Sequence, residues 1–397
     1  MGGRPCLTRS RHSRKTGRAG RERRSKGEGR RCLAPRHGPC VATNPTALRV
    51  TRSVLRARIA LAMTLILTQS EVEALLPMET CMDLMAEVLM TLARGEAENP
   101  LRTALVLPDR SGLLGMMPGF VTSPAALGLK VVGVFHANHG TELDSHQGVV
   151  ALFDAKTGVP LAIVEASSIT AIRTAAVSGV ATRLLAREDA GDLAILGAGV
   201  QAQTHLAAMA VARPLRRVRV YSPRPESRRS FAELESVGLG LEIEAVDSAR
   251  EAVLGADLIC TTTSAREPVV EGAWLAPGAH VNAVGSSIPT TRELDTDAVQ
   301  RARLFVDRRE STVNEGGEYL FPLKEGAITA DHILGELGDL LLERVVGREA
   351  SDDVTLFKSL GLAVEDLAAA RFVVDRALEQ GVGTTVDLTG RKHGGAR

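Results

Sequence analysis

The stretch GDLAILGAGVQAQTHLAAMAVA, residues 191–212, decides the fold of this chain. A short apolar run leads into Gly197-x-Gly199-x-x-Ala202, and an alanine-rich segment with helical spacing follows. A glycine turn between a strand and a helix is typical of a dinucleotide-binding unit, because the turn brings backbone N–H groups and a helix N-terminus to a pyrophosphate. A doubly wound fold without a nucleotide is the alternative. The segment predicts cofactor contacts at Gly197, Gly199, Val200, Gln201 and Ala202.

The residues after this turn continue the same pattern. "RRVRVYSP", "LEIEAVD", "DLICTTTS", "HVNAVGS" and "ARLFVD" read as strands, and helical segments separate the first of them. Strands that alternate with helices of this length indicate a parallel, doubly wound sheet. We therefore predict an α/β fold with a Rossmann-type domain at 188–311.

The flanking regions read differently. Five strand-like runs lie between residues 102 and 167, separated by Gly, Pro and Asp turns, and they predict an antiparallel sheet. Ser70-x-x-Glu73 predicts a capping box. After Ser311 we expect mainly helix, including one long amphipathic pattern from 354 to Gly381. We expect residues 63–187 and 312–390 to form an α+β substrate-binding and dimerisation domain into which the Rossmann-type domain is inserted.

The first 62 residues differ in charge from the remainder. They carry 17 Lys and Arg against two acidic residues, and the remainder has 31 basic and 45 acidic residues. Such a basic, apolar-poor leader is typical of a disordered arm, a targeting segment or a nucleic-acid-binding arm. Alternatively, translation starts at Met63. No nucleic-acid binding is expected from the body of the chain.

The remaining composition indicates a soluble protein. Hydrophobic residues make up 44% and charged residues 24% of the chain, and the run "IALAMTLIL" is too short to span a bilayer. Cys81 and Cys260 lie in apolar segments, which favours a reducing compartment over a disulfide framework. No Cys/His cluster has zinc spacing, so no metal is expected. We predict a cytoplasmic protein.

The end of the second Rossmann strand, "VRVYSPRP", bears on cofactor choice. NAD-preferring sites usually place an acid here to bind the ribose hydroxyls. This chain offers Ser222 and Arg224 instead. A hydroxyl and a guanidinium suit a 2′-phosphate, so we predict a preference for NADP(H), with NAD(H) as the alternative.

Several segments together resemble the ornithine cyclodeaminase/μ-crystallin family, which also includes alanine dehydrogenases and ketimine reductases. They are "GLKVV", "HQGVVALFDAKTG", "ITAIRTAAVSGVAT", "GAGVQAQTH", "NAVGSSIPTTRELD" and "FKSLGLAVEDLAAA". The resemblance covers nearly all of 63–390. It implies a homodimer in which one domain holds a small imino or amino acid and the other a nicotinamide cofactor.

The resemblance also assigns roles to individual residues. It implies that Arg102 and Lys130 bind the substrate carboxylate, with Lys130 also catalytic and Leu360 beside the substrate. His146-Gln147 matches a motif of the first domain, although a structural histidine is equally consistent. The cofactor contacts that follow from the resemblance, or from strand ends at the carboxyl edge of the sheet, are Arg173 at the phosphates, Thr174, Thr261, Thr262, Val284, Gly285, Ser286 and Ser359.

Two positions depart from the cyclodeaminase pattern. Ser287 stands where cyclodeaminases carry a proposed acid/base aspartate, and Gly115 stands where they place another acid. A serine cannot shuttle a proton unaided near neutral pH. We therefore favour an NAD(P)H-dependent imine reductase or amino-acid dehydrogenase acting on a small 2-imino or 2-oxo acid. Ornithine cyclodeaminase and a non-catalytic, ligand-binding protein of the μ-crystallin type are the alternatives.

Overall fold

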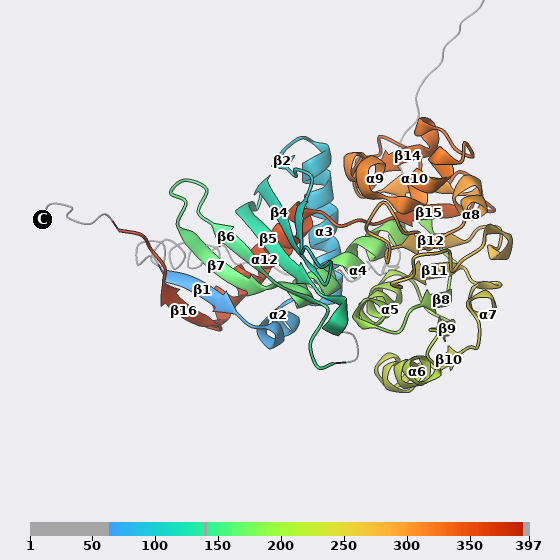
Figure 1. Ribbon diagram of the computed structural model, residues 1–397, viewed down its shortest axis with the longest axis horizontal. Coiled ribbons are helices and arrows are strands. Elements are labelled where there is room, and N and C mark those ends of the chain that lie inside the picture. Colours follow the sequence, from blue (N-terminus) through green and yellow to red (C-terminus); the bar gives the residue numbers. More distant parts are fainter. Residues whose placement is uncertain (1–62, 139–140, 392–397) are drawn as a thin grey trace, which may run out of the picture. The chain divides into compact units, whose positions relative to one another are not determined.

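Two eight-stranded sheets form the frame of the computed structural model (Figure 1). The structure describes residues 63–138 and 141–391. The basic leader, residues 1–62, and the predictions made for it lie outside this range. Within it, no helix is long and apolar enough to cross a membrane.

The second sheet contains the quoted glycine turn, and every pairing in it is parallel. In pairing order its strands are β10 (Ile243–Ala245), β9 (Arg217–Tyr221), β8 (Asp192–Leu196), β11 (Leu258–Thr261), β12 (His280–Ala283), β15 (Thr355–Lys358), β13 (Arg303–Val306) and β14 (Ile333–Glu336). The chain reverses direction of winding at β8, which lies between β9 and β11 (Figure 1). A parallel sheet with this reversal is the predicted doubly wound Rossmann-type arrangement, and the α/β fold class is confirmed.

Helices connect these strands. They are α5 (Val200–Ala212), α6 (Pro225–Leu239), α7 (Ala249–Val253), α8 (Thr296–Arg301), α9 (Arg309–Glu315), α10 (Gly317–Lys324) and α11 (Leu337–Leu341). Helix α5 follows β8 directly after the glycine turn, as the sequence predicts.

The prediction of one long helix from 354 to 381 was wrong. The structure divides this segment into strand β15, a turn, and helix α12 (Ala363–Gln380). All four β15 residues are buried, so the strand lacks the alternation that would separate it from a helix in the sequence. Gly361, at φ +81°, makes the break. Because β14 and β15 extend the parallel sheet beyond residue 311, the sheet does not end where we expected its domain to end.

The first sheet is mixed. In pairing order it contains β16 (Thr384–Asp387), β1 (Met63–Leu67), β7 (Pro160–Glu165), β6 (His146–Phe153), β5 (Ala125–Val134), β4 (Leu113–Thr122) and β2 (Ala97–Glu98), with β3 (Thr103–Val106) also on β4. The strands β3 to β7 are the antiparallel run predicted from the sequence. Strand β1 pairs in parallel with β7 and antiparallel with β16.

Helices contact one face of this sheet. They are α2 (Gln69–Leu75), α3 (Met78–Ala93), α4 (Ala166–Leu185) and α12. Gly179 on helix α4 faces Met82 of α3, where a Cβ would approach the methionine methyl group to 2.6 Å. The capping box of α2 is shifted from the expected pair, because Glu71 accepts hydrogen bonds from the backbone N–H and the hydroxyl of Thr68.

Candidate functional site

The glycine turn lies at the carboxyl edge of the parallel sheet, where ligands of doubly wound folds bind. Gly197 has φ +115°, and a Cβ there would lie 2.7 Å from the Thr262 carbonyl oxygen. A Cβ at Gly199 would meet no atom within 4 Å, so the backbone there is open to a ligand. Ala202, in the first turn of α5, is fully buried. The turn therefore has the geometry that the sequence motif predicts.

The start of α5 has groups that fit a dinucleotide. Gly199 is its N-cap and supplies no side chain to the first N–H groups of the helix, which carry the positive end of its dipole. The Gln201 Oε1 atom is buried without a hydrogen-bond partner in the described part of the chain, whereas Val200 is exposed beside it. The N–H groups and the positive dipole end at the start of α5, rather than the Gln201 acceptor oxygen, thus fit a pyrophosphate at this end of the helix.

The segment after β9 has one exposed cation and one engaged cation. Ser222 is buried and Arg224 is exposed, directly before α6. Arg228, which the sequence analysis did not single out, donates to the Ser222 carbonyl oxygen at 3.0 Å and pairs with Asp247. Arg224, for which the described residues provide no ion-pair partner, is therefore the guanidinium nearest in sequence to the position of the usual acid.

Lys130 lies on the helix-covered face of the first sheet and is 3% exposed. Its Nζ is 2.7 Å from Asp366 Oδ2 on α12 and donates to Thr170 Oγ1 on α4 at 3.3 Å. Burial lowers the pKa of Lys130 to about 8, although the nearby Asp366 carboxylate opposes this shift. The lysine has these two partners among the described residues, one fewer than the three donors of an ammonium group.

Arg173 joins the same group. Its Nε donates to Asp366 Oδ1 at 2.7 Å and its NH1 to Glu365 Oε2 at 2.9 Å. Burial alone would lower the pKa of Arg173, but Asp366 and Glu365 reverse this and raise it. The structure thus brings Arg173 to Lys130 through a shared carboxylate. These contacts do not support the expected role of Arg173 at the cofactor phosphates. Thr174, next to it on α4, is buried.

Arg102 joins the two sheets. It follows β2, and its guanidinium donates to the Ser287 carbonyl oxygen at 2.6 Å and to the Leu360 carbonyl oxygen at 3.2 Å. The same group pairs with Glu315 at 2.7 Å. Both carbonyls belong to segments that follow strands of the parallel sheet, β12 and β15. Arg102, Ser287 and Leu360 therefore lie together, as a shared substrate site requires.

The hydroxyls at the strand ends have partners within the protein. Thr261 Oγ1 donates to Glu293, Thr262 Oγ1 to the Leu196 carbonyl oxygen, and Ser286 Oγ to the Thr291 carbonyl oxygen. Val284 and Ser287 are half-buried, and Ser359 is buried with its N–H on the Ala283 carbonyl oxygen. These side chains line the carboxyl edge of the sheet, and the three hydroxyls named first donate hydrogen bonds within the protein.

Sequence reasoning missed the acidic members of the site. Asp366 and Glu365 bind Lys130 and Arg173, and Asp307 accepts hydrogen bonds from the backbone N–H groups of Leu360 and Gly361. Burial raises the pKa of Glu365 to about 8. The Arg173 charge opposes this shift, and the Asp307 charge adds to it. Two adjacent acids in the apolar pattern "LAVEDLAAA" were the available signal, because charges on a buried helix face need partners.

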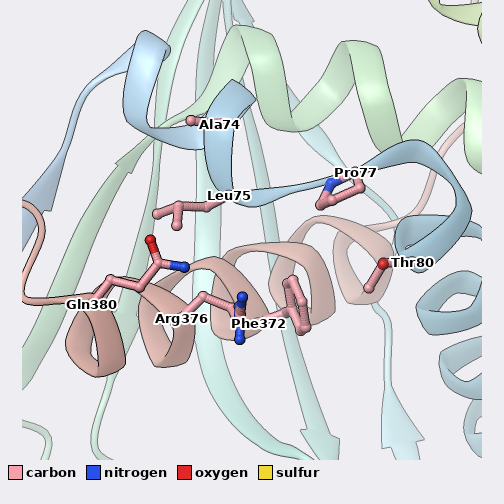
Figure 2. Close-up of a pocket in the computed structure, with 7 residues that line it drawn as sticks. All are labelled: Ala74, Leu75, Pro77, Thr80, Phe372, Arg376 and Gln380. Carbon is pink, nitrogen blue, oxygen red and sulfur yellow. The ribbon is translucent and has the colours of Figure 1, made fainter.

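A separate hollow of about 290 Å³ lies between α2, the start of α3 and α12 (Figure 2). Its lining residues are Ala74, Leu75, Pro77, Thr80, Phe372, Arg376 and Gln380. None of them is a predicted site residue. Its one charged side chain, Arg376, pairs with Glu379 at 3.2 Å. His146 and Gln147 are exposed at the start of β6. Among the described residues no group of three or more His, Cys, Asp or Glu could hold a metal ion.

Comparison with known proteins agrees with this geometry. The chain is 40% identical over 283 residues, 71% of this chain and 86% of the relative, to "Ketimine reductase mu-crystallin" of Mus musculus. It is similar to the structure of Thermococcus litoralis Delta(1)-pyrroline-2-carboxylate reductase in complex with NADH and L-proline, with a TM-score of 0.80, 41% identity and coverage of 81% of this chain and 100% of that one.

A third similar structure is an archaeal alanine dehydrogenase dimer with bound NAD, with a TM-score of 0.78, 32% identity and coverage of 82% of this chain and 100% of that one. The profile of the ornithine cyclodeaminase/mu-crystallin family matches residues 62–381. The match spans every described strand except β16, and it includes Lys130, Arg173, Glu365 and Asp366. The chain belongs to the ornithine cyclodeaminase/mu-crystallin family.

Proposed function

We propose that this protein is an NAD(P)H-dependent reductase of a small 2-imino acid. The observation that carries the proposal is the buried Lys130, held by Asp366 beside Arg173 in an apolar sheet. A buried cation with a remaining donor is suited to a substrate carboxylate. The relatives named above act on imino or amino acids according to their names, which supports the same substrate class.

Lys130, Arg102 and Arg173 supply the cationic side of the substrate site. Arg102 exchanges its Glu315 contact for the substrate carboxylate, and Lys130 adds a fixed point charge. Each charge-assisted bond contributes about 1.5–3 kcal/mol, or roughly ten- to a hundredfold in affinity. Fixing the carboxylate orients the imine carbon toward the cofactor. The bound nicotinamide supplies the hydride.

Ser287 limits the proton chemistry of the site. Its hydroxyl cannot serve as a general acid/base at neutral pH, whereas reduction of an already protonated cyclic imine needs no such group. This favours imine reduction over cyclodeamination of ornithine.

A substrate screen tests the function directly. The protein is incubated with NADPH or NADH and Δ1-pyrroline-2-carboxylate, Δ1-piperideine-2-carboxylate, or pyruvate plus ammonia, and separately with ornithine and NAD. We expect reduction of at least one imine. Faster formation of proline and ammonia from ornithine would overturn the proposal. Tight cofactor binding without turnover of any of them would favour a carrier role.

The Ser287→Asp variant tests the reaction selectivity. Ser287 binds Arg102 through its backbone oxygen, so this contact survives the substitution. We expect imine reduction to fall and ornithine turnover to rise relative to wild type. Ser287→Ala is the matched control, and it should leave imine reduction within about threefold because the hydroxyl performs no proton transfer. Unchanged ratios in Ser287→Asp would remove this position from reaction selection.

The cofactor preference is proposed to be NADP(H). Exposed Arg224 and buried Ser222 follow β9, where an acid would repel a 2′-phosphate. The similar structures hold NADH or NAD, so the comparison of cofactors is the deciding measurement. We expect kcat/KM in the wild-type protein to be higher with NADPH than with NADH. In Arg224→Ser the ratio of the two values should fall about tenfold, because one charged contact is removed. A wild-type ratio of one or below would contradict the proposal.

A homodimer is proposed through the outer face of the first sheet. Met117, Lys130 and Val150 lie in register and face the helices. Their neighbours in sequence therefore face the other way. These outward side chains include Leu114, Met116, Leu127, Leu129, Val131 and Val149, and Leu114 is 40% exposed. A continuous apolar face of this kind is typical of an interface. Analytical ultracentrifugation should show a dimer for the wild-type protein. The Leu114→Glu variant should be shifted toward the monomer.

The division into a substrate domain and a cofactor domain is part of the proposal, with its boundary set by sheet membership. Residues 188–311 together with β14 and β15 then form the cofactor domain. A cytoplasmic location is proposed from Cys81 and Cys260, which are buried free thiols.

A further inference from the structure

Glu293 lies beneath the carboxyl edge of the parallel sheet and is fully buried. Its Oε1 accepts from the backbone N–H and the hydroxyl of Thr263, at 2.7 and 2.8 Å. Its Oε2 accepts from Thr261 Oγ1 and the backbone N–H of Gly285, both at 2.7 Å. One carboxylate thus binds the segment after β11 and the segment after β12, two neighbouring strands on the side where the cofactor is expected.

Close packing makes this arrangement specific. A Cβ on Gly285 would lie 2.5 Å from Glu293 Oε1 and 2.1 Å from the Thr263 carbonyl oxygen. The Glu293 backbone N–H donates to Glu318 Oε1 at 2.9 Å, and Glu318 Oε2 is 3.0 Å from Lys358 Nζ. Lys358, the last residue of β15, also donates to the carbonyl oxygens of Ser286 and Ala283. The network therefore extends from β11 through β12 to β15.

We propose that Glu293 is a positioning residue that sets the spacing of the β11 and β12 loops for nicotinamide binding. The inference rests on the proposed cofactor site and adds a residue that does not touch the ligand. Both carboxylate oxygens accept from a backbone N–H, which can only donate. Neither oxygen can be replaced by an amide NH₂ without opposing a backbone N–H, although the threonine hydroxyls could rotate to accept.

Glu293→Gln is therefore a sharp test, because its NH₂ faces the Thr263 or the Gly285 N–H in either orientation. One of the two loops must move. We expect the dissociation constant of NADPH or NADH, measured by fluorescence titration of the full chain, to rise about ten- to a hundredfold. At saturating cofactor kcat should stay within about threefold of wild type, because the ion pairs of Lys130 and Arg173 with Asp366 and Glu365 are untouched.

Asp257→Asn is the matched control. Asp257 is the residue before β11, and its Oδ2 accepts from the backbone N–H groups of Gly191 and Asp192 at 3.0 and 3.1 Å. It joins the starts of β8 and β11, so it shares β11 with Glu293 but lies at the opposite edge of the sheet. We expect Asp257→Asn to lower stability in denaturant while leaving the cofactor dissociation constant within about twofold of wild type.

Three outcomes decide the inference. Weaker cofactor binding in Glu293→Gln but not in Asp257→Asn supports it. Wild-type affinity in Glu293→Gln, or equal weakening in both variants, overturns it while leaving the proposed function intact. Absence of cofactor binding in wild type would overturn the proposed function itself. If Glu293→Gln does not fold, Thr261→Val removes one donor from the same carboxylate, and it should weaken cofactor binding severalfold or the inference fails.

Discussion

Two buried lysines, Lys130 and Lys358, have contrasting environments. Each ends in an ion pair, Lys130 with Asp366 at 2.7 Å and Lys358 with Glu318 at 3.0 Å. Lys358 uses its remaining N–H groups on two backbone carbonyl oxygens, whereas Lys130 makes one further contact, to Thr170. An ammonium group has three donors. Within the described residues Lys358 therefore has three partners and Lys130 two, and we propose that the remaining donor of Lys130 binds the substrate.

Their carboxylate partners differ as well. Asp366 also binds Arg173, so it keeps a cation when Lys130 is removed. Glu318 has Lys358 as its paired cation and one backbone N–H from Glu293. The comparison teaches that burial of a lysine does not by itself mark a binding site. What marks it is an unfilled donor together with a carboxylate that another cation can satisfy.

The largest effect is expected on stability, from Lys358→Met. Removal of the ammonium leaves Glu318 buried without a cation, which costs about 3–5 kcal/mol in the free energy of unfolding. Urea denaturation measures it. A loss below about 1 kcal/mol would show that Glu318 takes up a proton at little cost, and the distinction between the two lysines would fail.

Lys130→Met should affect catalysis more than folding. We expect kcat/KM for the imino acid to fall about a hundredfold, because a charge-assisted bond of about 1.5–3 kcal/mol is lost. The substitution should lower the free energy of unfolding, measured in urea, by less than Lys358→Met does, since Asp366 keeps its ion pair with Arg173. Steady-state kinetics and denaturation of both variants side by side provide the measurement. A reversed order of stabilities would contradict the assignment.

The pH dependence follows from the lowered pKa of Lys130, about 8 against 10.5 in the unfolded chain. Above pH 8 the folded protein loses this proton first, so affinity for a carboxylate falls up to tenfold per pH unit. Over the same range the unfolded state binds more protons, and the contribution of Lys130 to stability rises toward pH 10.5. Titration with cyclopentanecarboxylate, which has no ionising nitrogen, measures the affinity. Constant affinity from pH 7 to 10 would refute the binding role.

The smallest expected effect comes from Thr170→Val. It removes the 3.3 Å hydrogen bond that orients Lys130 and leaves the ion pair with Asp366 intact. A neutral hydrogen bond contributes about 0.5–1.5 kcal/mol, so KM for the imino acid should rise roughly two- to tenfold. Thr91→Val is a control, because the Thr91 hydroxyl donates to the Glu87 carbonyl oxygen within α3. Equal changes in both variants would make the effect one of general packing.

The two lysines also mark how far the sequence could be interpreted. Lys130 interrupts an apolar strand with clear turns on both sides, so it stood out. Lys358 lies in β15, whose four buried residues continue into α12 without a periodicity change, and the segment was predicted to be one helix. The glycine turn and the β3–β7 run were predictable because their signals are local. The carboxylate partners Asp366, Glu318 and Glu293 were not, since their pairing depends on contacts between distant segments.

The strand order of the parallel sheet carries a consequence for biosynthesis. Strand β15 is the last strand of that sheet to be made, yet it is inserted between β12 and β13, and β16 then completes the other sheet on β1. While β15 is still missing, the edges of β12 and β13 offer unpaired backbone groups to other chains. Such late, long-range pairing slows folding and favours aggregation of nascent or truncated chains. A fragment cut at residue 311 should therefore be less soluble than the whole protein.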